Sequence, residues 1–71
     1  MNKFNLAEQC YNECKEKGVS YKEAPKFLEW KLKNEDEEIS QAVEVYVRYN
    51  LNDQSITDNE IDFAKELLKN N

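Results

Sequence analysis

The chain has 71 residues, of which 15 are acidic and 10 basic, and it carries a formal net charge of −5 with no histidine. The lack of histidine removes the usual general base at neutral pH and the commonest zinc ligand, and the negative charge opposes nonspecific binding to nucleic acid or anionic lipid. We therefore expect one small domain without catalytic activity, cofactor or metal.

The sequence starts with a polar, charged stretch that lacks the apolar region of a signal peptide, and no apolar run approaches the roughly 18 residues that span a bilayer. We therefore expect a cytoplasmic protein that does not enter a membrane. A domain of this size buries only about 60 % of its unfolded surface, and a second subunit would add to its stability. For this reason we also expect a homodimer.

The first predicted helix covers residues 5–17. Apolar side chains recur there at helical spacing, at Leu6, Ala7, Cys10, Tyr11 and Cys14. Gly18 stands where a helix commonly ends on a left-handed residue, and Val19 can close that end against Cys14. Cys10 and Cys14 are four residues apart, so their side chains run parallel, and we expect two reduced thiols that act as small apolar side chains. A redox or intersubunit role is the alternative.

The next segment carries two conflicting signals for the start of a helix. Ser20 and Glu23 have the spacing of a capping box, but Pro25 would then fall inside the helix, where its ring removes a hydrogen bond. We predict a turn over residues 20–24 and a helix over residues 25–34, although Ala24 is a poor cap. The apolar side chains of this helix are Phe27, Leu28, Trp30 and Leu32.

The third predicted helix, residues 37–50, follows an acidic run formed by Glu35, Asp36, Glu37 and Glu38. Negative charge stabilises the first turn of a helix, with Asn34 or Asp36 as the cap, and the same run can serve as an acidic patch for a partner. Residues 42–49 also alternate with the period of a strand, but no other segment could pair with them, so we prefer the helix. In a helix, Val45 and Tyr49 lie off the apolar stripe that begins at Ile39, and we expect both to face a partner.

A loop over residues 50–56 leads to the last predicted helix, residues 58–69. Thr57 and Glu60 form a capping box, and Ile56 and Ile61 have the spacing of a hydrophobic staple across the same helix start. The loop does not match a calcium-binding loop, because Asp58 stands where that loop needs glycine.

Together these elements predict an all-α fold, a small bundle of three to four short helices in a single domain over residues 1–71. The predicted core consists of Leu6, Cys10, Phe27, Leu28, Ile39, Val43, Tyr46, Ile61, Ala64 and Leu68.

Two features of the sequence indicate a binding function. Four tyrosines and one tryptophan exceed the needs of so small a core, and such side chains are favoured at interfaces. Residues 15–33 are rich in lysine, whereas residues 35–62 carry nine carboxylates against one arginine, so the chain is electrically lopsided. The candidate partner-binding residues are Trp30, Glu35, Asp36, Glu37, Glu38, Val45 and Tyr49.

The leading functional hypothesis is a noncatalytic regulator or inhibitor of the phage or mobile-element accessory type. It would dock on another protein, such as a basic or nucleic-acid-binding one, through an acidic and aromatic surface. The first alternative is a self-assembling structural or adaptor module, with the basic half of one copy against the acidic half of another. The second is a small DNA-binding regulator, but residues 25–34 offer too few outward arginine, asparagine and glutamine side chains, so we do not expect direct nucleic-acid binding.

Overall fold

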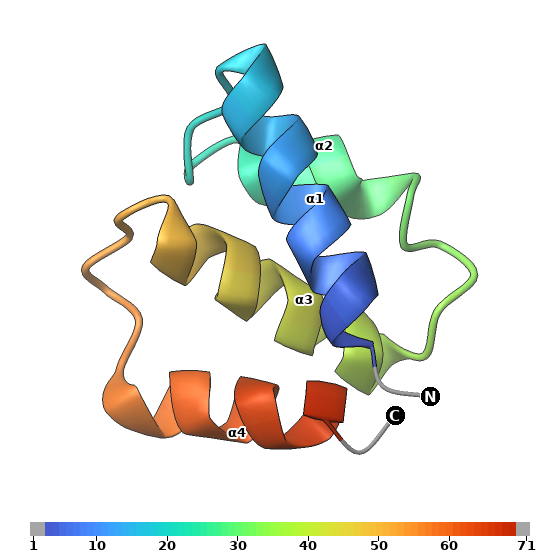
Figure 1. The fold of residues 1–71 in the computed structure, drawn as a ribbon, viewed down its shortest axis with the longest axis vertical. Coiled ribbons are helices and arrows are strands. Elements are labelled where there is room, and N and C mark those ends of the chain that lie inside the picture. The colour runs from blue at the N-terminus through green and yellow to red at the C-terminus, as the bar shows by residue number, and fades with distance from the viewer. Residues whose placement is uncertain (1–2, 70–71) are drawn as a thin grey trace.

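The computed structural model describes residues 3–69, and this part of the chain forms four α-helices (Figure 1). They are α1 (Phe4–Lys17), α2 (Ala24–Glu29), α3 (Glu37–Asn50) and α4 (Asp58–Lys69). Residues 3–69 contain no β-strand. The predicted all-α bundle of short helices is therefore confirmed, and the bounds of α3 and α4 are those predicted.

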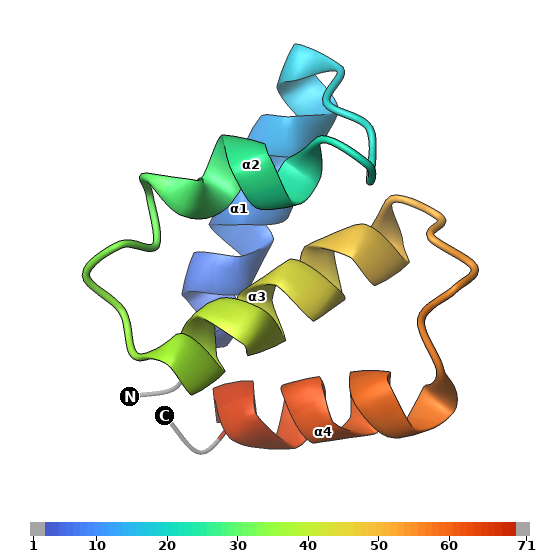
Figure 2. The same ribbon diagram turned by 180° about the vertical axis from the view of Figure 1, so that it is seen from behind.

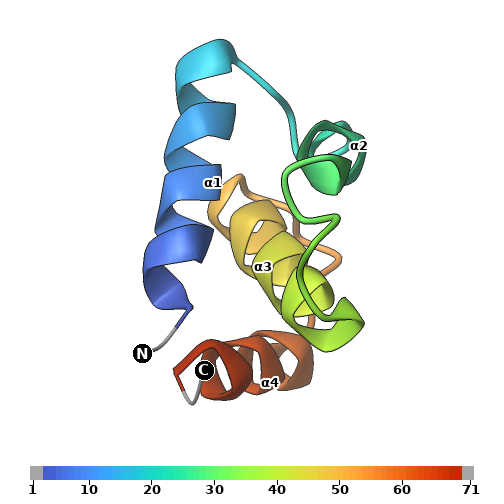
Figure 3. The same ribbon diagram turned by 90° about the vertical axis from the view of Figure 1, so that its right-hand side faces the viewer.

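The central element of the bundle is α3, and the other three helices pack on it (Figures 1 and 2). α4 runs antiparallel beside α3, and these two helices form the most extensive packing in the molecule. α1 and α2 cover other sides of α3, as the view in Figure 3 shows. Among the described residues α2 and α4 do not contact each other, so they occupy different sides of the central helix.

The two ends of the described chain lie side by side. The backbone N–H of Lys3 donates to the carbonyl of Leu68 at 2.7 Å, which ties the start of α1 to the last turn of α4. The rings of Phe4 and Tyr46 add an edge-to-face contact between α1 and α3, with 5.8 Å between their centroids.

Small and branched side chains fill the core. Most of the predicted core residues are buried, namely Cys10, Leu28, Ile39, Val43, Ile61, Ala64 and Leu68. Leu6, Phe27 and Tyr46 are only partly buried and pack against the core from its edge. The prediction left out further buried residues, which are Ala7, Cys14, Ala24, Leu32, Ala42 and Val47. Small side chains such as alanine beside larger ones let the facing helices interdigitate.

The end of α1 has the structure predicted for the chain's single glycine. Gly18 has a φ of 70°, in the left-handed region that favours glycine. Its N–H donates to the carbonyl of Lys15, and the N–H of Val19 donates to the carbonyl of Cys14 at 2.8 Å. This pair of bonds is the Schellman motif, and it satisfies carbonyls that the end of a helix would otherwise leave without partners.

Cys10 and Cys14 are fully buried on the inner face of α1, and neither forms a disulfide. Burial raises the pKa of the Cys10 thiol to about 11, and it also raises the pKa of Cys14. A protonated, inaccessible thiol is a poor nucleophile. Both cysteines therefore act as small apolar core residues, as their spacing predicts.

The start of α2 follows a turn, as predicted. The carbonyl of Ser20 accepts the N–H groups of Glu23 and Ala24, which closes the turn directly before the helix. The helix then begins at Ala24 with Pro25 in its first turn, where proline's missing N–H costs no helical bond.

The predicted end of α2 is wrong, because the helix stops at Glu29 and not at Asn34. Beyond the end of the helix, the carbonyl of Leu32 accepts hydrogen bonds from two other groups. It accepts the N–H of Glu35 and, at 3.2 Å, the hydroxyl of Ser40 on α3. These bonds hold the buried Leu32 against the bundle and turn the chain towards α3.

Residues 42–49 belong to α3, so the helical interpretation is confirmed and the strand alternative is wrong. Ile39, Val43 and Val47 recur every four residues and are all buried, as one face of a helix requires. A strand would have put Val47 and Tyr49 on the same face, whereas Tyr49 is exposed here. Asp36 occupies the N-cap position without a side-chain hydrogen bond to the helix.

The start of α4 contains the predicted capping box. The N–H of Thr57 donates to Glu60 Oε1 at 2.9 Å, and the N–H of Glu60 donates to Thr57 Oγ1 at 3.2 Å. Each side chain thus satisfies a backbone N–H that the first turn of a helix cannot satisfy itself.

Asp53 is a structural residue, although the sequence analysis counted it among the acidic residues of the C-terminal half. Its side chain is 4 % exposed and forms an ion pair with Arg48 at 2.7 Å. The N–H and the hydroxyl of Ser55 both donate to Asp53 Oδ1, at 2.9 and 2.6 Å. The carboxylate therefore fixes the loop between α3 and α4 and neutralises the arginine beside it.

None of the helices in residues 3–69 combines the length and the apolar character needed to cross a bilayer. In the same residues no group of three or more metal-ligating side chains is suitably placed to hold an ion.

Candidate interaction surface

Three large apolar residues are exposed in the described part of the chain. The exposed fractions are 66 % for Trp30, 46 % for Tyr49 and 53 % for Phe63. Single exposed apolar side chains are common on soluble proteins, so what matters is whether neighbouring residues extend each of them into a patch.

The side of the molecule formed by α3 and α4 carries a hollow with an apolar floor. α3 contributes Gln41, Ala42 and Val45 to its lining, and α4 contributes Glu60 and Phe63. Ala42 is buried and Val45 is half-buried, whereas Phe63 is exposed. An apolar side chain of a partner could fill this hollow and displace water from it.

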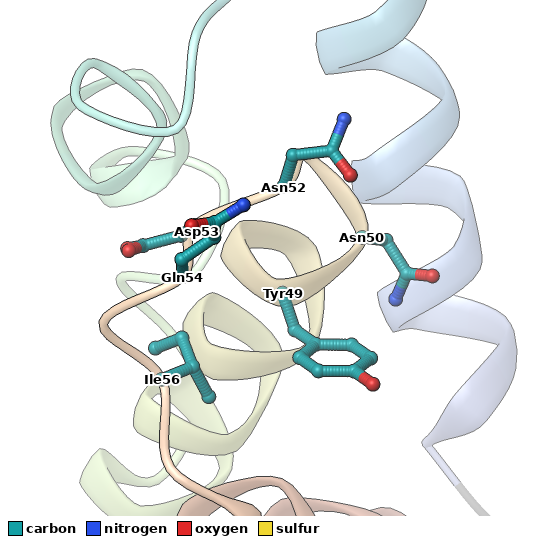
Figure 4. A pocket seen from close by; sticks show the side chains of 6 residues that line it. All are labelled: Tyr49, Asn50, Asn52, Asp53, Gln54 and Ile56. Atoms are coloured by element: carbon teal, nitrogen blue, oxygen red, sulfur yellow. The ribbon is translucent and has the colours of Figure 1, made fainter.

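Tyr49 extends the apolar surface by one turn of α3 beyond Val45. It lines a neighbouring hollow together with Ile56 and polar residues of the loop (Figure 4). In Figure 4 the tyrosine ring projects outward from the last turn of α3, and Ile56 lies across the hollow on the loop. Val45 therefore lies where α3 meets α4, and Tyr49 lies one turn further along α3, beside the loop that leads to α4.

Carboxylates stand at both ends of this surface. Glu38 shares one face of α3 with Val45 and Tyr49, because residues 7 and 11 positions apart lie on the same side of a helix. Glu60 lines the hollow from the first turn of α4. Hydrogen bonds from Thr57 hold the pKa of Glu60 below its ordinary value, so this carboxylate is ionised at neutral pH. We name Glu38, Val45, Tyr49, Glu60 and Phe63 the acidic–aromatic surface.

The acidic half predicted from the sequence is divided in the structure. Because α3 and α4 are antiparallel, the acidic run at the start of α3 lies beside the end of α4 (Figure 1). Asp58, Glu60 and Asp62 lie at the start of α4, at the other end of the helix pair, where Glu60 faces the middle of α3 at Val45. α3 has 14 residues and is therefore about 20 Å long. The negative charge thus forms two clusters at opposite ends of the helix pair.

The predicted acidic run is only partly available to a partner. Glu35 is half-buried and forms an ion pair with Lys3 at 3.2 Å, so its charge is already matched within the chain. Asp36, Glu37 and Glu38 are exposed on the first turn of α3. Of these, Glu38 is the one that shares the face of Val45 and Tyr49.

Trp30 is not brought together with Tyr49. The bond between the hydroxyl of Ser40 and the carbonyl of Leu32 sets the segment after α2 beside the first half of α3, whereas Tyr49 lies in the last turn. The surroundings of Trp30 are basic. It lines a hollow with Lys26 and Lys33, and the ammonium of Lys31 lies 5.3 Å from the centroid of its ring.

Phe63 is the functional candidate that the sequence analysis missed. Ile61, Ala64 and Leu68 form the buried stripe of α4, and Phe63 falls outside that stripe. The same criterion identified Val45 and Tyr49 on α3, so a helical-face analysis of α4 would have found Phe63 as well.

No protein-family model matches this chain, and comparisons with curated proteins and with solved structures also gave no match.

Proposed function

We propose that this protein is a noncatalytic regulator or inhibitor, of the kind that phages and mobile elements carry as accessory proteins, and that it binds a basic partner protein through its acidic–aromatic surface. The observation that carries the proposal is the hollow between α3 and α4. Its apolar lining at Val45 and Phe63 lies beside the ionised Glu60, and Tyr49 continues it along α3. Exposed aromatic side chains around an apolar floor are typical of the anchors of protein interfaces.

The two kinds of side chain have different tasks in this proposal. Glu38 and Glu60 attract a basic surface over roughly 10 Å at moderate salt, and so they accelerate encounter. Tyr49 and Phe63 lose their contact with water only after docking, and so they determine mainly how long the complex lasts.

The test begins with the partner. A pull-down from a lysate of the native host followed by mass spectrometry names candidates, and binding kinetics on the purified candidate then decide. Glu38→Gln combined with Glu60→Gln removes both charges, while glutamine at position 60 preserves the capping box. We expect the association rate to fall by roughly three- to tenfold at low salt, with a nearly unchanged dissociation rate.

The matched control is Glu8→Gln combined with Glu16→Gln, which removes the same net charge from exposed positions on α1. This control should bind almost as fast as the unaltered protein. An equal loss of rate in the control, or an association rate that does not respond to salt, would refute a steering role for the acidic–aromatic surface.

The aromatic residues require a separate measurement. Phe63→Ala and Tyr49→Ala should each raise the dissociation rate by about tenfold, because an anchor at the centre of an interface contributes more than 1 kcal/mol. Trp30→Ala serves as the comparison, since Trp30 is as exposed but lies outside the surface. If Trp30→Ala shortens the lifetime of the complex and the other two substitutions do not, the partner binds elsewhere.

A further inference from the structure

The outer side of α2 forms a second surface, which the proposed function does not use. Two adjoining hollows lie there and have Lys26 in common. Besides Lys26, the first hollow is lined by Val19, Lys22 and Phe27, and the second by Trp30 and Lys33. We name these six residues the basic–aromatic surface.

Positive charge and apolar area alternate on this surface. Trp30 is the most exposed of the large apolar side chains, and Phe27 is half-buried. The ammonium of Lys17 lies 5.9 Å from the ring centroid of Phe27, and that of Lys31 lies 5.3 Å from the ring of Trp30. Lysines at this distance are attracted by the faces of the rings. Lys17 thus keeps a positive charge next to Phe27, whereas the charge of Lys31 is already matched by an ion pair with Glu13. Glu23 and Glu29 also line the two hollows, but lysines outnumber them.

The surface therefore fits an occupant that combines exposed aromatic residues with negative charge. The acidic–aromatic surface has this composition, with Tyr49 and Phe63 beside Glu38 and Glu60. We propose that the basic–aromatic surface of one copy binds the acidic–aromatic surface of a second copy. The proposal rests on the proposed function only in that both use the acidic–aromatic surface.

Nucleic acid and anionic membranes suit the basic–aromatic surface less well. The surface holds only three lysines, and Glu23 and Glu29 lie among them, so it offers a polyanion few unopposed positive charges. A second copy carries its negative charge at two ends of the α3–α4 pair and can turn one end towards the lysines. Every copy carries both the basic–aromatic and the acidic–aromatic surface, so the two surfaces are always present at equal concentration.

The two surfaces allow head-to-tail association. They have no residue in common, and α2 and α4 lie on different sides of α3 (Figure 2). Each copy can therefore use both of its surfaces at once, and the contact is heterologous, which produces open chains or rings and not only a symmetric dimer. A basic partner and a second copy would then compete for the same acidic–aromatic surface, so self-association would limit partner binding at high protein concentration.

The experiment uses two single substitutions at exposed aromatic positions. Trp30→Glu places a negative charge among the lysines, and Phe63→Lys places a positive charge in the acidic–aromatic surface. Sedimentation velocity at about 20 mM and about 300 mM salt should show concentration-dependent association of the unaltered protein that weakens at the higher salt. The self-association of each variant alone should be weaker by about tenfold or more. Circular dichroism confirms that both variants retain their helices.

Mixing the two variants gives the decisive result. The Trp30→Glu protein retains the acidic–aromatic surface and the Phe63→Lys protein retains the basic–aromatic surface, so an equimolar mixture should form complexes of one copy of each. Three results would overturn the proposal: an unaltered protein that stays monomeric at low salt, variants that associate as well as the unaltered protein, or a mixture that stays monomeric. Partner binding by the Trp30→Glu variant tests the proposed function separately, because its acidic–aromatic surface is intact.

Discussion

The buried carboxylate of Asp53 organises the loop between α3 and α4, the two helices that form the hollow of the acidic–aromatic surface. Asp53 accepts two hydrogen bonds from Ser55 and pairs with Arg48, and its own N–H donates to the Arg48 carbonyl. A buried carboxylate is tolerated only when its oxygens have such partners. The loop that carries Ile56 is thereby fixed to the last turn of α3, directly before Thr57 and the start of α4.

This carboxylate makes the stability of the fold depend on pH in acid. The hydrogen bonds of Ser55, aided by Arg48, lower the pKa of Asp53 below its ordinary value, and the Thr57 N–H does the same for Glu60. A carboxyl group with a depressed folded-state pKa contributes stability that is complete above its unfolded pKa and is lost as pH falls through the folded value. We expect the free energy of unfolding in urea to decrease from about pH 5 to about pH 2.5.

Two variants identify the groups responsible for this decrease. Asp53→Asn should reduce this decrease in the free energy of unfolding between about pH 5 and about pH 2.5, which we call the acid limb. It should also lower stability at pH 7, because Arg48 then has no charged partner. Ser55→Ala keeps the backbone bond to Asp53 and should flatten the limb less. An acid limb as steep in Asp53→Asn as in the unaltered chain would assign the pH dependence to other carboxylates.

Helix ends in this chain differ in whether local signals alone determine them. Thr57 and Glu60 bond to each other's backbone N–H at the start of α4, so the signal is complete within four residues. Thr57→Ala should lower the free energy of unfolding by roughly 1 kcal/mol, measured by urea denaturation. The matched control is Ser20→Ala, since the Ser20 hydroxyl bonds only to the exposed Glu23 side chain and caps no helix. Equal losses in the two variants would mean that the capping box does not hold α4.

The parts of the fold that local patterns determine were predictable from the sequence. Gly18 ends α1 through its own left-handed conformation, and α3 and α4 have the predicted bounds. The path of the chain after α2 was not predictable, because the segment that follows Glu29 is held by a non-local contact, the bond from Ser40 to Leu32 eight residues away. The burial of Asp53 has a local signal, the serine two residues later, but only the structure shows that Arg48 reaches it.

The candidate site was predictable only in part, for the same reason. Helical periodicity on α3 identifies Val45 and Tyr49 as residues off the core stripe. Their combination with Phe63 depends on the antiparallel pairing of α3 and α4, which brings together residues far apart in the sequence. The separation of the acidic charge into two clusters follows from the same pairing, and composition alone suggested a single acidic half.

At the scale of the whole molecule, α3 separates two surfaces of opposite character. The basic–aromatic surface lies on α2 and the acidic–aromatic surface lies between α3 and α4. Since α2 and α4 are not in contact within the described residues, one surface can be altered without direct damage to the other. This independence is what makes the paired substitutions at Trp30 and Phe63 informative.

The hydrogen bond from Lys3 to Leu68 brings the start of α1 beside the end of α4, so the first and last helices could be joined to each other. A short flexible linker between Lys3 and Lys69 would close a small gap at little entropic cost, and the chain could be opened at the exposed pair Lys33 and Asn34. The resulting permutant runs α3, α4, α1, α2 and preserves every helix-to-helix contact. We expect the same helical circular dichroism spectrum and a single cooperative unfolding transition. Loss of either would show that the covalent connection between α2 and α3 is itself required, and that packing around α3 alone does not determine the fold.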